Sequence, residues 1–130
     1  LIKQLAFNDN VRTLILKDGQ DVSALADRKL SYISANETNF IAFNLATEEY
    51  HNELFEELKY INGDTKTIKS FDNDFFVASK GEPKTSPWMG NANEVSEHTF
   101  IRNQIHHQKD NGKTKYQTLK ASIEKMRMFF

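Results

Sequence analysis

The stretch of this sequence best suited to chemistry is Arg102-Asn103-Gln104-Ile105-His106-His107, near the end of the 130 residues. Arginine binds and neutralises phosphate, and histidine exchanges protons near neutral pH. In a helix, Asn103 and His107 share a face, so the Asn103 amide can orient the His107 imidazole. Arg102 and His107 are five residues apart, about 140° around a regular helix, and point in different directions. A joint Arg102–His107 site therefore needs a second surface to complete it.

Other kinds of site find little support. Gly112-Lys113-Thr114 is similar to the end of a phosphate-binding loop, but the upstream glycine of such a loop is absent. The chain has no cysteine, which excludes disulfides, thiolate zinc ligands and cysteine nucleophiles. His98 and His106 lie about 12 Å apart along a helix, too far to share one ion. We therefore expect no metal ion and no cofactor.

The R-N-x-x-x-H spacing of Arg102, Asn103 and His107 resembles the signature of the HEPN superfamily of helical domains, which bind nucleotides or cleave RNA. In that family two protomers pair through the motif helix, and the composite cleft gathers Arg and His from both. The resemblance implies that Arg102, Asn103 and His107 are the catalytic residues of a metal-independent ribonuclease. His107 would move protons while the RNA 2′-OH attacks, and Arg102 would hold the phosphate.

A longer pattern covers residues 100–130. Phe100 to His107, followed by Ser122-Ile123-Glu124 in a last helix, resembles the C-terminal part of ABC/AAA-type ATPases of bacterial phage-defence systems. This resemblance implies that the chain is a C-terminal fragment of a longer bacterial protein. Its expected role is an assembly or effector-recruitment module that forms a homo-oligomer, or binds a partner protein, through the helix over 94–108.

Two alternatives remain open at this point. One is a toxin-type ribonuclease that uses Arg102 and His107, and the other is a purely structural scaffold domain. In the structural interpretation, Arg102 pairs with Glu97 or Glu48, while His106 and His107 cap the C-terminal end of their helix.

Three segments are predicted to be helices. Over 46–61, Tyr50, Leu54, Leu58 and Ile61 recur at helical spacing, widened by Phe55. The second helix is predicted over 94–108, with Asn93 as N-cap. The third is predicted over 115–130, where apolar residues recur at three- and four-residue steps.

Residues between these helices favour strands and a loop. Aromatic and branched residues predict strands over 11–16, 30–34 and 40–45, and a strand pair over 67–78 broken by Asp72-Asn73-Asp74. Both prolines fall in 79–93, which predicts an internal loop held to the core by Trp88. Together these elements predict a single α+β domain over 1–130, with the C-terminal helix pair and the helix over 46–61 packed on a small irregular sheet.

Composition limits the class of protein and its partners. Hydrophobic residues make up 38% and charged residues 27%, which is typical of a globular domain, and the net charge of −1 provides no overall positive field for nucleic acid. Any RNA binding would have to be local, in the basic last third of the chain. No apolar run reaches the roughly 18 residues that a membrane span needs. We expect a cytoplasmic protein without a membrane partner.

Overall fold

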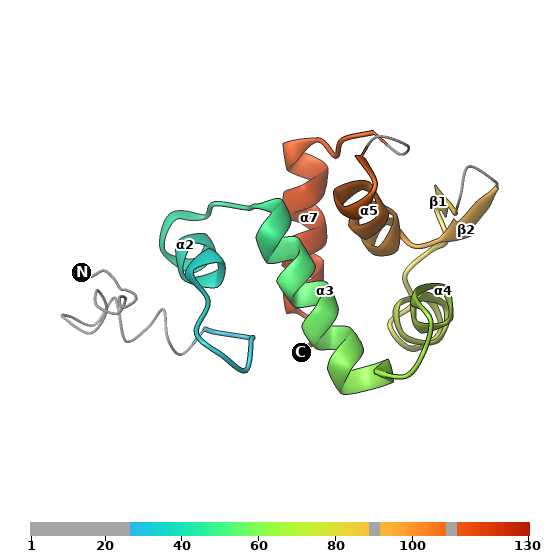
Figure 1. Ribbon diagram of the computed structural model, residues 1–130, viewed down its shortest axis with the longest axis horizontal. Helices are drawn as coiled ribbons and strands as arrows, with labels where there is room; N and C mark the ends of the chain where they lie inside the picture. Colours follow the sequence, from blue (N-terminus) through green and yellow to red (C-terminus); the bar gives the residue numbers. More distant parts are fainter. Residues whose placement is uncertain (1–26, 89–91, 109–111) are drawn as a thin grey trace. The chain divides into compact units, whose positions relative to one another are not determined.

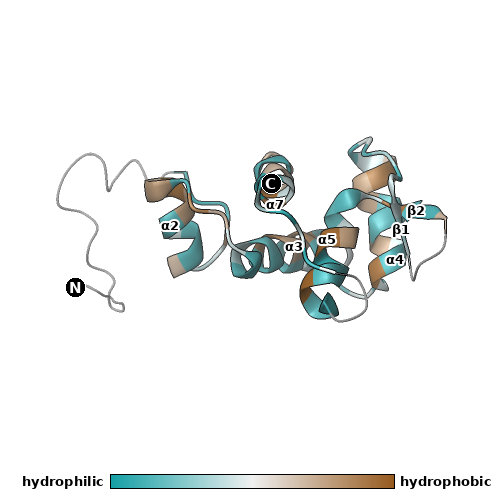
Figure 2. Ribbon diagram, turned by 90° about the horizontal axis from the view of Figure 1, so that it is seen from above, coloured by the Kyte–Doolittle hydropathy of each residue, from teal (hydrophilic) through white to brown (hydrophobic). Residues whose placement is uncertain are grey.

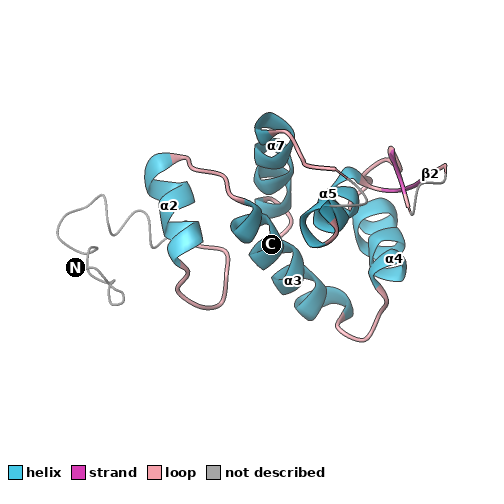
Figure 3. Cartoon of the chain, turned by 45° about the horizontal axis from the view of Figure 1, so that its top comes forward, coloured by secondary structure: helices cyan, strands magenta, loops and turns pink. Residues whose placement is uncertain are grey.

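The computed structural model describes residues 27–88, 92–108 and 112–130. Its elements run α2 (Ala35–Phe43), α3 (Glu48–Gly63), α4 (Ile68–Phe71), the π-helix η1 (Asp72–Ser79), β1 (Ser86–Pro87), β2 (Asn93–Val95), α5 (Glu97–His106) and α7 (Tyr116–Arg127). The described chain is mostly helical, with one short antiparallel strand pair (Figure 3). The predicted α+β class is confirmed.

The chain divides into two compact units, Leu1–Leu45 and Ala46–Phe130. The single domain expected over 1–130 remains a prediction. The strand expected over 11–16 lies outside the described residues.

In the first unit, α2 begins at a local capping signal. Ser34 is the N-cap, and its Oγ accepts a hydrogen bond from the Glu37 backbone N–H at 3.3 Å. The buried Glu37 carboxylate accepts from the backbone N–H groups of Lys29 and Leu30. Asn44 ends the helix in the left-handed conformation, with φ 57°.

The strands predicted over 30–34 and 40–45 are therefore wrong. The described chain has bends and a cap over 30–34, and Phe40 to Phe43 complete α2. The aromatic and branched content around Phe40 favoured a strand, whereas the capping residues Ser34 and Asn44 determine a helix.

The second unit is built around α3, which confirms the helix predicted over 46–61. Thr47 caps it by accepting the Tyr50 N–H at 3.0 Å. In Figure 1, α5 and α7 both lie against α3. The fully buried side chains of this core come from all three helices and from the segment α4–η1; they are Tyr50, His51, Leu54, Phe55, Leu58, Phe71, Phe76, Ile101, Ile123 and Met126. Ile61, expected on the apolar stripe of α3, is instead 60% exposed.

Residues 67–78, predicted as a strand pair, form α4 and η1 instead. Thr67 caps α4 by accepting the Ser70 N–H at 3.2 Å. Phe71, Phe75 and Phe76 then form an aromatic cluster with Phe55, with ring centroids 5.2–5.7 Å apart. The π-helical winding lets Lys80 N–H donate to the Phe75 carbonyl, five residues back, at 2.9 Å. Figure 2, coloured by hydropathy, shows both hydrophilic and hydrophobic stretches on the helices of this segment. The strand prediction rested on the aromatic and branched residues, which the structure places in α4 and η1.

The remaining boundaries differ from the sequence prediction by a few residues. Within the expected loop 79–93, Ser86 pairs with Val95 and Pro87 with Asn93, so this segment contains β1 and meets β2. Asn93 is a strand residue rather than an N-cap. The helix α5 begins at Glu97, three residues later than predicted, and its N-cap is Ser96. Trp88 is half-buried, and the Lys69 Nζ lies 6.0 Å from its ring centroid.

Candidate functional site

The R-N-x-x-x-H residues lie at the C-terminal end of α5. Arg102 and Asn103 are half-buried, whereas His106 and His107 are exposed. His107 is the C-cap of the helix, and its backbone N–H donates to the Asn103 carbonyl at 2.8 Å. The position of His107 fits the capping role considered from the sequence.

The Arg102 guanidinium forms a hydrogen bond through Nη1 but not through Nε. Its Nη1 donates to Asn103 Oδ1 at 3.0 Å, while its Nε is buried without a hydrogen-bond partner. Burial lowers the Arg102 pKa, and the negative charge of Glu56 on α3 opposes this shift. The acidic residue that acts on Arg102 is therefore Glu56, rather than the Glu97 or Glu48 considered from the sequence. Glu48 accepts hydrogen bonds from Gln108 and lies 3.5 Å from the Lys113 Nζ.

His106 is the histidine that the structure joins to α3. Its Nε2 lies 2.8 Å from Asn52 Oδ1, and because that oxygen only accepts, Nε2 carries the proton. Partial burial and the nearby Arg102 charge lower the His106 pKa. The imidazole is therefore mostly neutral at neutral pH.

Asn103 connects the motif in a way the sequence did not indicate. Its side-chain oxygen accepts from Arg102, and its backbone carbonyl accepts from His107. The expected orientation of the His107 imidazole by the Asn103 amide remains a prediction. We name the surface formed by Arg102, Asn103, His106, His107, Asn52 and Glu56 the motif face.

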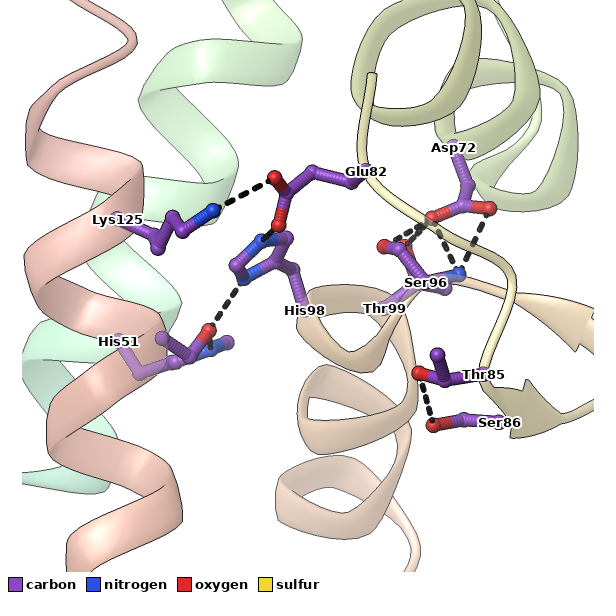
Figure 4. Close-up of polar contacts among 10 residues, drawn as sticks. His51, Asp72, Glu82, Thr85, Ser86, Ser96, His98, Thr99 and Lys125 are labelled. Carbon is purple, nitrogen blue, oxygen red and sulfur yellow. Dashed lines mark hydrogen bonds and ion pairs between the residues drawn. The ribbon is translucent and has the colours of Figure 1, made fainter. Parts of the chain in front are cut away.

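A second cluster of polar groups, which the sequence analysis missed, lies inside the unit (Figure 4). The Ser122 Oγ is 2.8 Å from His51 Nε2 and 2.6 Å from His98 Nδ1. The His98 Nε2 is 2.7 Å from Glu82 Oε1, and Lys125 reaches the other Glu82 oxygen at 3.0 Å. His51, His98 and Ser122 are buried, and they come from α3, α5 and α7. We name His51, Ser122, His98 and Glu82 the relay.

The sequence contained one signal for the relay. His51 lies three residues before Leu54, and Ser122 lies three residues after Leu119 and four before Met126, so both occupy the apolar stripes of their helices. A polar residue on an apolar stripe needs a buried partner. The sequence does not show which partner each would find, because Ser122 lies 71 residues after His51 and 24 residues after His98 and only tertiary packing brings them together.

Neither cluster resembles a metal centre. Across residues 27–88, 92–108 and 112–130, no three His, Asp or Glu side chains are grouped so that they could hold a metal ion. Within the same residues, no helix is long and apolar enough to cross a membrane.

Comparison with protein-family models, with curated proteins and with solved structures found no match for this chain.

Proposed function

We propose that this chain is a HEPN-like assembly and effector-recruitment module of a bacterial anti-phage defence ATPase, acting through the motif face. The R-N-x-x-x-H spacing and the resemblance of residues 100–130 suggest the class of protein. The geometry of Arg102 supports an interface role, because its guanidinium is directed by a neighbouring amide at a partly exposed position.

The observation that carries this proposal is the incomplete pairing of Arg102. Its Nη1 binds Asn103, whereas its buried Nε has no partner. The buried Nε is out of reach of a second surface, but Arg102 as a whole is only half-buried, so the rest of its guanidinium can donate to an acceptor that a partner supplies. Arginine is also enriched at the energetically dominant positions of interfaces.

The partner proposed for this face is a second copy of the chain. Arg102 and the exposed Glu56 carry opposite charges on one face, and a twofold axis would set each against the other residue of its partner. A twofold interface then contains two such ion pairs, one for the Arg102 of each copy. A second copy also supplies the surface that Arg102 and His107 need for a joint site.

Light scattering across a concentration series tests this function. We expect the wild-type chain to self-associate and Arg102→Ala to remain monomeric at the same concentrations. Lys66→Ala removes an equal charge from an exposed lysine outside the motif face and should leave association unchanged. A wild-type chain that stays monomeric at high concentration contradicts the proposal.

A metal-independent ribonuclease is the second candidate function. The observation in its favour is that Arg102 lies close enough to His106 to lower the pKa of this exposed imidazole, with the His107 ring centroid 6.5 Å from that of His106. In this mechanism the RNA 2′-OH gives its proton to a histidine and attacks the phosphate, and the leaving 5′-oxygen takes up a proton. Arg102 stabilises the developing negative charge.

The ribonuclease candidate predicts cleavage that persists in EDTA and leaves 2′,3′-cyclic phosphate ends. His107→Ala should abolish cleavage, and His106→Ala should reduce it less, because the resemblance places the proton-transferring histidine at position 107. The rate should follow a bell-shaped pH profile. RNA that stays intact in the presence of the assembled protein removes this candidate and leaves the assembly role in place.

A further inference from the structure

The relay connects four segments of the second unit that are distant in the sequence. His51 is on α3, Ser122 on α7 and His98 in the first turns of α5, and Glu82 follows η1 (Figure 4). Its three hydrogen bonds are 2.6–2.8 Å long. Through His98, the motif helix α5 is thereby bound directly to α7 and to the segment after η1, and through Ser122 it is linked to His51 on α3.

The hydrogen bonds of the relay have a single consistent direction. The Glu82 carboxylate accepts, so the proton of a neutral His98 is on Nε2 and its Nδ1 is bare. The Ser122 hydroxyl must then donate to that Nδ1. The Ser122 oxygen is left to accept from His51 Nε2–H.

This assignment also explains the unpaired atom of the cluster. The His51 Nδ1 is buried without a hydrogen-bond partner. With the proton on Nε2, this nitrogen is a bare acceptor and no N–H is left without an acceptor. The opposite direction would bury an unpaired His51 N–H and turn a bare His98 nitrogen toward the Glu82 carboxylate.

An added proton is incompatible with this arrangement. On His51 it would go to Nδ1, which has no acceptor. On His98 it would go to Nδ1, which then donates to Ser122 and deprives the serine hydroxyl of its acceptor. In either case a buried donor loses its partner, which is costly.

Some of the charges around the two imidazoles raise their pKa values and others lower them. His51 faces His98, whose charged form would repel a charge on His51. His98 faces Glu82 and Glu97, which favour its charged form, and Lys125, which opposes it. The rings of Phe76 and Phe129, 5.0 and 6.0 Å from the His98 ring, exclude water from it. Burial lowers the pKa of His51 from 6.5 to about 3 and also lowers that of His98.

We propose that the relay is an acid-sensitive latch for the motif helix: with both histidines neutral it binds α5 to α3 and α7, and protonation in acid releases α5. The direction of the effect follows from linkage. The unfolded histidines take up protons below about pH 6.5 and the folded ones resist, so the stabilisation is complete above that pH and is lost as the pH falls. The latch concerns how α5 is held, and is independent of what the motif face binds.

The test compares the thermal unfolding of wild type, His51→Gln and His106→Gln between pH 8 and pH 5, followed by circular dichroism. The glutamine amide at position 51 can still donate to Ser122 but does not titrate. We expect the melting temperature of wild type to fall toward pH 5, and that of His51→Gln to fall clearly less. His106→Gln removes a histidine that lies on the same helix as His98 but is only partly buried, so it should reduce the fall less than His51→Gln does. An equal fall in wild type and His51→Gln overturns the proposal.

Two measurements on the wild-type chain test the latch without any substitution, and they apply even when His51→Gln fails to fold. Nitrogen-15 NMR of the histidines should find His51 and His98 neutral at pH 7.5, both with the proton on Nε2. Amide hydrogen exchange, corrected for its intrinsic pH dependence, should show α5 losing protection at a higher pH than α3. A charged ring, the other tautomer, or simultaneous loss of protection in both helices contradicts the latch.

Discussion

Asp72 shows how one buried side chain determines where a functional helix begins. Its carboxylate is fully buried and accepts from the Ser96 backbone N–H at 3.2 Å, the Ser96 hydroxyl at 2.6 Å and the Thr99 hydroxyl at 2.7 Å. Ser96 is the N-cap of α5 but forms no capping bond with its own side chain. Asp72 therefore serves as the cap from another element, at the helix end where a negative charge is favoured.

Replacing Asp72 with Ala should lower the free energy of unfolding by about 2–3 kcal/mol, because it leaves these buried donors without an acceptor. Denaturant unfolding measures this change. Asp74→Ala is the matched control, two residues along η1, since Asp74 is exposed and bound to Lys66 at the surface. The role of Asp72 is contradicted if the two variants are equally stable.

At the scale of elements, α7 supplies much of the surface that α3 and α5 pack against. Leu119, Ile123 and Met126 are buried, as the three- and four-residue spacing predicts. Tyr116 and Phe130, at the two ends of the predicted stripe, are 50% and 40% exposed. The core contribution of α7 is thus concentrated in its central turns.

Ile123→Ala should destabilise the chain by about 2–5 kcal/mol, because it leaves a cavity where the side chain is fully buried. Leu119→Ala should act in the same direction. Thermal unfolding is the measurement, with the exposed neighbour Glu124→Ala as control. Unchanged melting of both core variants would mean that α7 is only loosely attached.

The accuracy of the sequence prediction differs between elements for physical reasons. The helices α3 and α7 were predictable because each has an apolar stripe with the period of a helix. The helix α5 was predicted from signals at its two ends, and it begins three residues later than predicted because Ser96, not Asn93, is its N-cap. The segment 67–78 was not predictable, since its phenylalanines favour a strand locally and are buried through the winding of η1. Asp72-Asn73-Asp74 looked like a turn because the sequence does not show that the Asp72 carboxylate caps α5.

The candidate site was predictable to a similar extent. The spacing of Arg102, Asn103 and His107 placed the candidate site late in the helix that is α5, and that these residues form a functional site stays a prediction. The partners Asn52 and Glu56, and the whole relay, depend on how α3 and α7 pack on α5. Sequence spacing within one helix carries no information on such contacts.

At the scale of the whole molecule, the two sides of α5 have different surroundings. Its buried side is held by Asp72 and by the relay, whereas its C-terminal end presents the motif face. In the proposed dimer, a helix fixed in this way would keep Arg102 and His107 in place before the second copy binds, which would lower the entropic cost of association.

The central claim is that the motif face joins two copies of the chain. Sedimentation equilibrium of charge-reversed variants tests this claim most directly. We predict that Arg102→Glu and Glu56→Arg each weaken self-association at least tenfold, equivalent to about 1.4 kcal/mol, because each sets like charges against one another across the interface. The variant that carries both reversals should regain association, since opposite charges face each other again. Circular dichroism of all three variants verifies that they are folded. Folded single variants that associate as tightly as the wild-type chain would contradict the account.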